Sequence, residues 1–192
     1  QENRNGNTFN GNAFVDITFL KDFKFTFNVG TTVNEIRYYT TTNPYYGFGA
    51  EQNGTVTMYH YRTTTLNLQQ ILNYSHNFGK HNISVMLGHE SYKYNYAELS
   101  ASKKNMFSYW GNHELNGAVI DGSSAASYSN DYNTEGYFFR ALYDYDAKYY
   151  FSASYRRDAS SRFHPDHWWG NFYSVGGAYL MSKEDWFDVK WI

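Results

Sequence analysis

The sequence contains no cysteine, only 2 prolines and few charged residues among its 192 positions. Without cysteine the chain has no disulfide, no thiolate metal site and no cysteine nucleophile. No apolar run approaches the length of about 18 residues that a transmembrane helix requires, so a span of that kind is excluded. The formal net charge of -2 provides no general electrostatic attraction for nucleic acid, which binds to basic surfaces.

Aromatic residues, in contrast, are abundant: 21 Tyr, 15 Phe and 5 Trp make up 21% of the chain. Disordered chains are poor in aromatics, so this composition indicates a folded protein. Apolar residues recur with a period of two, which is typical of β-strands, and not with the i, i+3, i+4 spacing of amphipathic helices. This alternation predicts seven strands, at residues 9–19, 23–34, 65–74, 83–90, 136–145, 149–156 and 172–180. The sequence therefore predicts an all-β protein.

The connections between these strands alternate in length. The short ones are Lys21-Asp22, His76–His81 and Asp146–Lys148; the long ones are Tyr39–Tyr59, Tyr94–Asn133 and Arg157–Trp169. This order places the tight turns at one end of the sheet and the long loops at the other, as in outer-membrane barrels with short periplasmic turns. The pattern favours an antiparallel transmembrane β-barrel segment. The alternative is a soluble up-and-down barrel or a sugar-binding β-domain with tyrosine-rich edges.

In a membrane barrel the two faces of each strand meet different surroundings. We expect one set of side chains to face lipid (Val85, Leu87, Phe139 and Ala153) and the alternate set to face the lumen (Ser84, Arg140, Asp144, Ser152 and Arg156). Many aromatics lie near the ends of the predicted strands, where barrels carry aromatic girdles at the two membrane interfaces. They are Tyr38, Tyr39, Tyr59, Tyr61, Tyr92, Tyr94, Tyr96, Tyr149 and Tyr150.

The stretch from Tyr132 to Phe187 carries an ordered series of motifs. They are Asn133–Phe138, Arg140-Ala141, Tyr143–Asp146, Tyr155–Phe163, His164–Asp166, Trp169–Phe172 and Ser174–Gly176. This series strongly resembles the barrel of SusC/RagA-type TonB-dependent outer-membrane transporters, over about a third of the chain. Upstream, His81–Ile83 and Leu87–Glu90 agree with the same family more loosely.

The resemblance implies a 22-stranded barrel closed by an N-terminal plug. It further implies import of oligosaccharides or peptides, with a SusD-like surface lipoprotein as lid and energy from the TonB complex through a box ahead of the plug. Neither plug nor TonB box is visible in residues 1–192. We therefore interpret the chain as a partial barrel domain of a longer protein in the outer membrane, whose first and last predicted strands do not pair with each other. The alternative function is a non-transporting surface adhesin or glycan-binding module.

Catalysis finds little support in the sequence. No Gly-x-Ser-x-Gly, Walker-type or His-Glu-x-x-His motif occurs. His164 and His167 lie close together, but no further ligand has the spacing of a metal site. We expect no enzyme activity, no metal and no cofactor. The charges of Arg156, Arg157, Asp158 and Arg162 suggest either an anion site or, in the more ordinary interpretation, an ion-pair network that orders the adjacent loop.

Loop aromatics give the strongest indication of binding. Sugars present apolar C–H faces that stack on aromatic rings, and rings of this kind occur in or beside the predicted loops. The candidates for contact with a ligand or a lipoprotein lid are Tyr45, Tyr46, Tyr109, Trp110, Trp168 and Trp169. The ordinary alternative is that these rings pack the loops against one another or form a protein interface.

Overall fold

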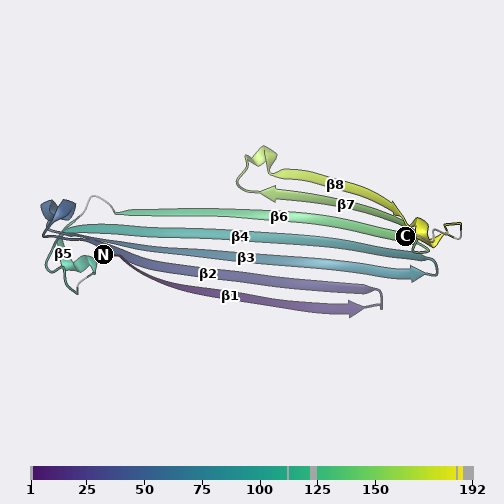
Figure 1. Cartoon of the computed structure of the whole chain (residues 1–192), viewed down its shortest axis with the longest axis horizontal. Helices are drawn as coiled ribbons and strands as arrows, with labels where there is room; N and C mark the ends of the chain where they lie inside the picture. The colour runs from purple at the N-terminus through teal and green to yellow at the C-terminus, as the bar shows by residue number, and fades with distance from the viewer. Residues whose placement is uncertain (1, 112, 122–124, 185, 188–192) are drawn as a thin grey trace. The chain divides into compact units, whose positions relative to one another are not determined.

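The computed structural model describes residues 2–111, 113–121, 125–184 and 186–187. These residues form an antiparallel sheet with the strand order β1-β2-β3-β4-β6-β7-β8, in which the short strand β5 pairs with β4 (Figure 1). The strands are β1 (Glu2–Phe19), β2 (Phe23–Thr42), β3 (Thr55–Phe78), β4 (His81–Met106), β5 (Ala118–Asp121), β6 (Ala126–Tyr145), β7 (Tyr149–Ser160) and β8 (Trp169–Tyr179). Four short 3-10 helices lie outside the strands: Gly47–Gln52, Leu115–Gly117, Pro165–His167 and Met181–Lys183.

The all-β class and the antiparallel arrangement predicted from the alternation are confirmed, and the seven predicted strands are the seven that follow one another across the sheet. The additional strand, β5, lies in a segment that we predicted to be loop. In the sheet order β1 and β8 are the two end strands and do not pair with each other, as expected, so the described sheet is open.

The predicted strand lengths were wrong. β3 and β4 have 24 and 26 residues, and strand structure replaces much of the predicted loops Tyr39–Tyr59 and Tyr94–Asn133. In these parts polar residues occupy both faces, so the apolar alternation disappears although the backbone hydrogen bonds continue. The predicted connection His76–His81 was also too long, because β3 continues to Phe78 and only Gly79 and Lys80 separate it from β4.

The chain divides into two compact units, which we describe separately. The hairpin unit (Asn12–Gly30, Asn67–Lys93 and Tyr132–Ile192) contains the three tight hairpins, and the loop unit (Gln1–Gly11, Thr31–Leu66 and Tyr94–Asp131) contains the two longest connections. Two of the hairpins place non-glycine residues at positive φ: Leu20 and Lys21 in one, Asp146 and Ala147 in the other. Consecutive residues at positive φ are typical of tight hairpin turns, because their twist matches that of the flanking strands.

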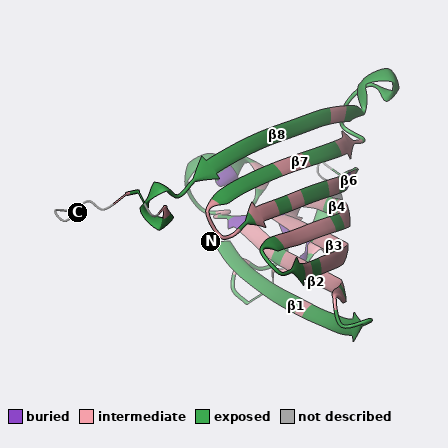
Figure 2. Cartoon of the chain, turned by 90° about the vertical axis from the view of Figure 1, so that its right-hand side faces the viewer, coloured by how far each residue is buried: buried purple, intermediate pink, exposed green. Residues whose placement is uncertain are grey.

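Few side chains are buried in the described residues, and Figure 2 shows a sheet coloured almost throughout as exposed or intermediate. The buried apolar side chains are Val56, Met106 and Ala118, all of the loop unit. No helix among the described residues is long and apolar enough to cross a membrane. Large apolar side chains are instead exposed on the strands, such as Phe14, Leu87, Phe151 and Val175. Exposed apolar surface of this extent indicates a surface that is covered by a partner or by lipid.

Candidate functional site

The pairing register of the hairpin unit separates an apolar face from a polar face. Ala153 lies opposite Ala141 on β6 and Val175 on β8, whereas Ser152 lies opposite Leu142 and Gly176. Directly opposed residues point to the same face, and successive residues of a strand point to opposite faces. Phe139, Tyr155 and Ala153 therefore share the apolar face, while Arg140, Ser152 and Arg156 share the polar one. This separation agrees with the alternation predicted from the sequence.

On β4 the same two faces are identified by side-chain contacts. His89 stacks on Tyr137 of the apolar face, with ring centres 4.7 Å apart. Val85 and Leu87 are four and two residues before His89 on the same strand, so they point to the apolar face as well. Asn82 donates a 2.9 Å hydrogen bond to the Asp144 carboxylate, so Ser84, two residues further on, lies on the polar face with Asp144.

The polar face carries a charged cluster centred on Arg156. The Arg156 Nε atom lies 2.8 Å from both carboxylate oxygens of Asp158, and a second guanidinium nitrogen lies 3.9 Å from Glu90 on β4. The guanidinium also lies over the Phe138 ring, 5.6 Å from its centre. Gly136 makes this arrangement possible, because a Cβ there would approach Asp158 Oδ1 to 2.5 Å.

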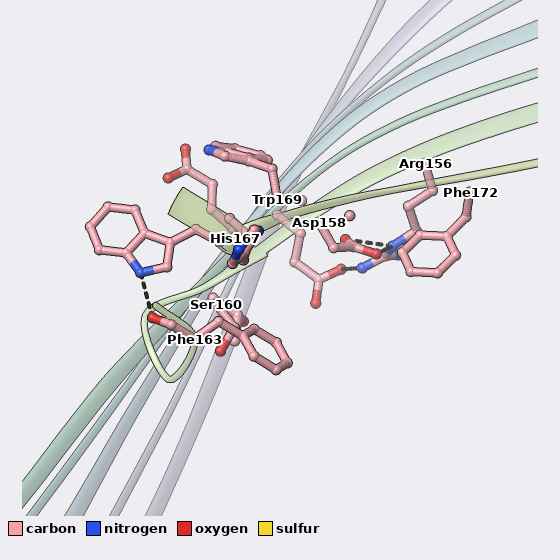
Figure 3. Close-up of a pocket in the computed structure, with 14 residues that line it drawn as sticks. Arg156, Asp158, Ser160, Phe163, His167, Trp169 and Phe172 are labelled. Carbon is pink, nitrogen blue, oxygen red and sulfur yellow. Dashed lines mark hydrogen bonds and ion pairs between the residues drawn. The ribbon is translucent and has the colours of Figure 1, made fainter. Parts of the chain in front are cut away.

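A hollow of about 620 Å³ lies beside this cluster, between the strands β6–β8 and the connection of residues 161–168 (Figure 3). Arg156, Asp158, Phe163 and Phe172 line it. Two of the predicted aromatics, Trp168 and Trp169, also line it. Its wall therefore combines an ion pair with four aromatic side chains, a combination suited to a polar ligand that also has apolar faces. Sequence reasoning found Arg156 and Asp158 but missed the contributions of Glu90, Phe163 and Phe172. Only the strand register and the course of the connection bring these three to the cluster.

The other predicted charges take different positions. Arg157 points to the face opposite Arg156, where its guanidinium lies 4.8 Å from the centre of the Trp169 ring. Arg162 lies 3.9 Å from the centre of the Tyr132 ring, and so it ties the connection of residues 161–168 to β6. Arg140 is exposed on the polar face, opposite Ser154.

The candidate loop aromatics divide into exposed rings and packed rings. Tyr45, Tyr46 and Trp110 are 72–78% exposed. Tyr109 packs against the buried cluster of Val56, Met106 and Ala118. Trp168 and Trp169 are about 40% exposed, and Trp168 Nε1 donates a 2.7 Å hydrogen bond to the carbonyl oxygen of Phe163. Among the six candidates, Tyr45, Tyr46 and Trp110 thus present the most open aromatic surface, while Trp168 and Trp169 also fix local structure.

The described residues hold no group of three or more His, Asp or Glu side chains placed to bind a metal ion. His164 and His167 have ring centres 6.5 Å apart on the connection of residues 161–168. His164 contacts Asp166 at 3.4 Å, and both of these side chains are largely exposed.

Comparison with known proteins identifies several relatives in sequence. No protein-family model matches the chain. The TonB-dependent receptor P3 of Formosa agariphila is 29% identical over 191 residues, covering 96% of this chain and 18% of that protein. The TonB-dependent receptor SusC of Bacteroides thetaiotaomicron is 26% identical over 189 residues, covering 94% of this chain and 18% of that protein. The chain thus spans less than a fifth of the length of these curated relatives.

Solved structures agree with the sequence relatives. The RagAB peptide importer in its closed-closed state matches with a TM-score of 0.86 and 24% identity, over 93% of this chain and 20% of that one. The open-open state of the same importer matches with a TM-score of 0.83 and 25% identity, over the same shares of the two chains. The named relatives are receptors and importers. In sequence and in fold, the chain matches one stretch of the barrel of a SusC-like TonB-dependent outer-membrane transporter, as its motifs predict.

Proposed function

We propose that this chain forms part of the wall of an outer-membrane transporter that imports oligosaccharides by a TonB-dependent mechanism. The remainder of the protein would supply the other strands of the barrel, a plug inside it and a TonB box. A SusD-like lipoprotein would cover the end of the barrel at which the long connections lie.

One observation carries the membrane assignment: the strands of the hairpin unit have the length and the two-faced composition of membrane-crossing strands. β7 and β8 have 12 and 11 residues, and a tilted strand needs about 9–11 residues to cross the hydrocarbon layer. Phe151 and Val175 on the apolar face are 58% and 85% exposed when only the described residues are considered. Lipid is the medium in which such a face is stable, while charges such as Arg156 and Asp158 belong in a watery lumen.

The choice of oligosaccharide over peptide is supported by the exposed rings of the connections. Tyr45 and Tyr46 form part of one connection and Trp110 of another. Rings that are open to solvent and flanked by polar side chains can stack on the C–H faces of sugars. A peptide substrate is the second candidate, because the solved structures with this fold include a peptide importer.

The proposal can be tested in the organism that makes the full protein. Deletion of its gene should abolish growth on one class of oligosaccharide as sole carbon source, and re-expression should restore growth. Membrane fractionation should recover the protein in the outer membrane in a heat-modifiable form. Loss of peptide uptake with unchanged oligosaccharide uptake would establish the second candidate. An outer-membrane protein whose deletion changes neither uptake would support the adhesin alternative.

A further inference from the structure

A row of tyrosines crosses the loop unit from β2 to β6. We call it the tyrosine row, and it consists of Tyr38, Tyr59, Tyr61, Tyr96 and Tyr128. Tyr38 and Tyr59 stack with ring centres 4.4 Å apart and an angle of 8° between the rings. Tyr61 lies 6.0 Å from Tyr96, and Tyr96 lies 6.1 Å from Tyr128. Neighbouring strands thus present an almost continuous aromatic surface on one face.

We infer that the row differs from an aromatic girdle, although the sequence analysis assigns Tyr38, Tyr59, Tyr61 and Tyr96 to one. β2 and β4 each begin at a tight turn, and counted from that end Tyr38 and Tyr96 are each the sixteenth residue of their strand. Tyr61 and Tyr128 are each the eighteenth residue counted back from the hairpin ends of β3 and β6. A tilted strand crosses the membrane in about 9–11 residues, so all four rings lie beyond the residues that are needed to cross it.

The row also has the wrong parity for a lipid-facing girdle. Tyr96 is even-numbered on β4, like Asn82 and Glu90, which contact Asp144 and Arg156 of the polar face. Tyr128 is even-numbered on β6, like Arg140 and Asp144. The tyrosines therefore belong to the residues of each strand that alternate with the apolar set.

Two hydroxyl groups of the row, those of Tyr61 and Tyr96, have charged hydrogen-bond partners. Arg4 donates a 2.5 Å hydrogen bond to the Tyr61 hydroxyl, and the Tyr96 hydroxyl donates one of 2.5 Å to Glu98. The hydrogen bond to Glu98, together with desolvation, raises the pKa of Tyr96 to about 12. The rings remain accessible at their faces: Tyr128 is 60% exposed and the other four are half-buried.

We propose that the tyrosine row binds a neutral oligosaccharide, which stacks along it on the way into the barrel. The proposal rests on the proposed import function and assigns that function a binding surface. Tyrosine offers a ring for the C–H face of a sugar and a hydroxyl for its polar groups. Several rings in succession suit a chain of repeating sugar units better than a single small ligand.

Two features of this face favour an oligosaccharide over a peptide. The charged side chains hydrogen-bonded to the row, Arg4 and Glu98, have opposite signs and so favour no charged ligand. Four of the five rings lie on β2, β3 and β4, each of which has a hydrogen-bonded strand on both sides. The backbone groups of these three strands are committed to the sheet and cannot pair with an added peptide strand, whereas β6 pairs with β7 only from Thr134 onwards.

The test uses the full-length protein, purified from outer membranes in detergent, and isothermal titration calorimetry. The ligand panel contains neutral hexasaccharides (malto-, cello-, xylo- and manno-hexaose) and a mixture of neutral hexapeptides. We compare the wild type with Y59A/Y61A/Y96A, with Y59F/Y61F/Y96F and with Y39A. Tyr39 is the matched control, because it is adjacent to Tyr38 on β2 and points to the opposite face, where it stacks on His113.

The alanine triple variant should weaken hexasaccharide binding about a hundredfold, because each of the three rings removed contributes about fivefold. The phenylalanine variant should stay within about threefold of the wild type, because it keeps the rings, and Y39A should bind normally. If the alanine variant fails to assemble, the single variant Y128A, at the most exposed ring, provides the same comparison.

Three results would overturn the assignment. Wild-type affinity in an assembled alanine variant would make the row cross-strand packing only. Loss of hexapeptide binding with hexasaccharide binding unchanged would make it a peptide surface. A wild-type protein that binds hexapeptides but no hexasaccharide would refute the proposed substrate as well as the row, whereas the first two results leave oligosaccharide import standing.

Discussion

Gly88 on β4 lies directly against the ring of Phe138 on β6, and a Cβ at position 88 would overlap three carbons of that ring. The packing of Phe138 on the polar face of the hairpin unit thus depends on the lack of a side chain at position 88. The space at Gly88 lets Phe138 lie flat on the neighbouring strand and beneath the guanidinium of Arg156. Glycine within a strand often marks a close approach of this kind.

Gly88→Ala should therefore destabilise the assembled protein by about 1–3 kcal/mol, the usual cost of overpacking. The double variant Gly88→Ala/Phe138→Ala should recover much of that loss, because the clashing ring is gone. The urea midpoint of the detergent-purified full-length protein measures both effects. Additive losses in the double variant would show that the ring is not the source of the cost.

The assignment of the two faces predicts an asymmetry between neighbouring positions on β7. Ala153→Arg puts a charge among Ala141 and Val175, whereas Ser152→Arg puts it on the face of Arg140 and Arg156. An arginine facing lipid near the middle of the membrane costs about 2–4 kcal/mol, and one facing the lumen costs much less. Heat-modifiable migration of outer-membrane fractions should show impaired assembly for Ala153→Arg alone. Equal defects in the two variants would count against the register, because a slip of one residue exchanges the faces.

A pH-dependent contact ties the end of the described chain to the hairpin between β6 and β7. Lys148 Nζ lies 3.2 Å from Glu184 Oε2, and Tyr149 donates a 3.1 Å hydrogen bond to Glu184 Oε1. The hydrogen bond from Lys148 contributes most to holding the pKa of Glu184 below its ordinary value of 4.5. The resulting stabilisation is complete above that ordinary value, and it is lost as the pH falls through the lowered pKa of the folded state.

Glu184→Gln should accordingly reduce the fall in stability between pH 5 and pH 3, measured by urea unfolding of the full-length protein at a series of pH values. Asp166→Asn is the control, because Asp166 is 81% exposed, and it should leave the pH profile unchanged. Parallel profiles for Glu184→Gln and the wild type would exclude Glu184 as the titrating group.

How much of this structure can be predicted from the sequence depends on where apolar alternation is present. In the hairpin unit the alternation is clear, and the strands, the tight turns and the division into two faces follow from it. In β4 beyond Tyr94, polar residues such as Asn95, Glu98 and Lys103 occupy both faces of the strand. Apolar alternation therefore does not predict this part of the strand. The hollow beside Arg156 is unpredictable for another reason. Glu90 lies on β4 and Phe172 on β8, and only the pairing of four successive strands brings both to the same arginine.

The structure finally separates the six candidate loop rings into two experimental groups. Tyr45→Ala/Tyr46→Ala/Trp110→Ala removes the three most exposed of the six rings, so it should reduce oligosaccharide uptake while leaving the free energy of unfolding within about 0.5 kcal/mol of the wild type. Trp168→Ala/Trp169→Ala removes the hydrogen bond to Phe163 and the contact with Arg157, and it should lower the urea midpoint. Uptake of a labelled oligosaccharide by whole cells and urea unfolding of the purified protein distinguish the two effects. If the first variant takes up oligosaccharide at the wild-type rate, Tyr45, Tyr46 and Trp110 have no part in capture, and the tyrosine row alone would remain as the aromatic surface for the substrate.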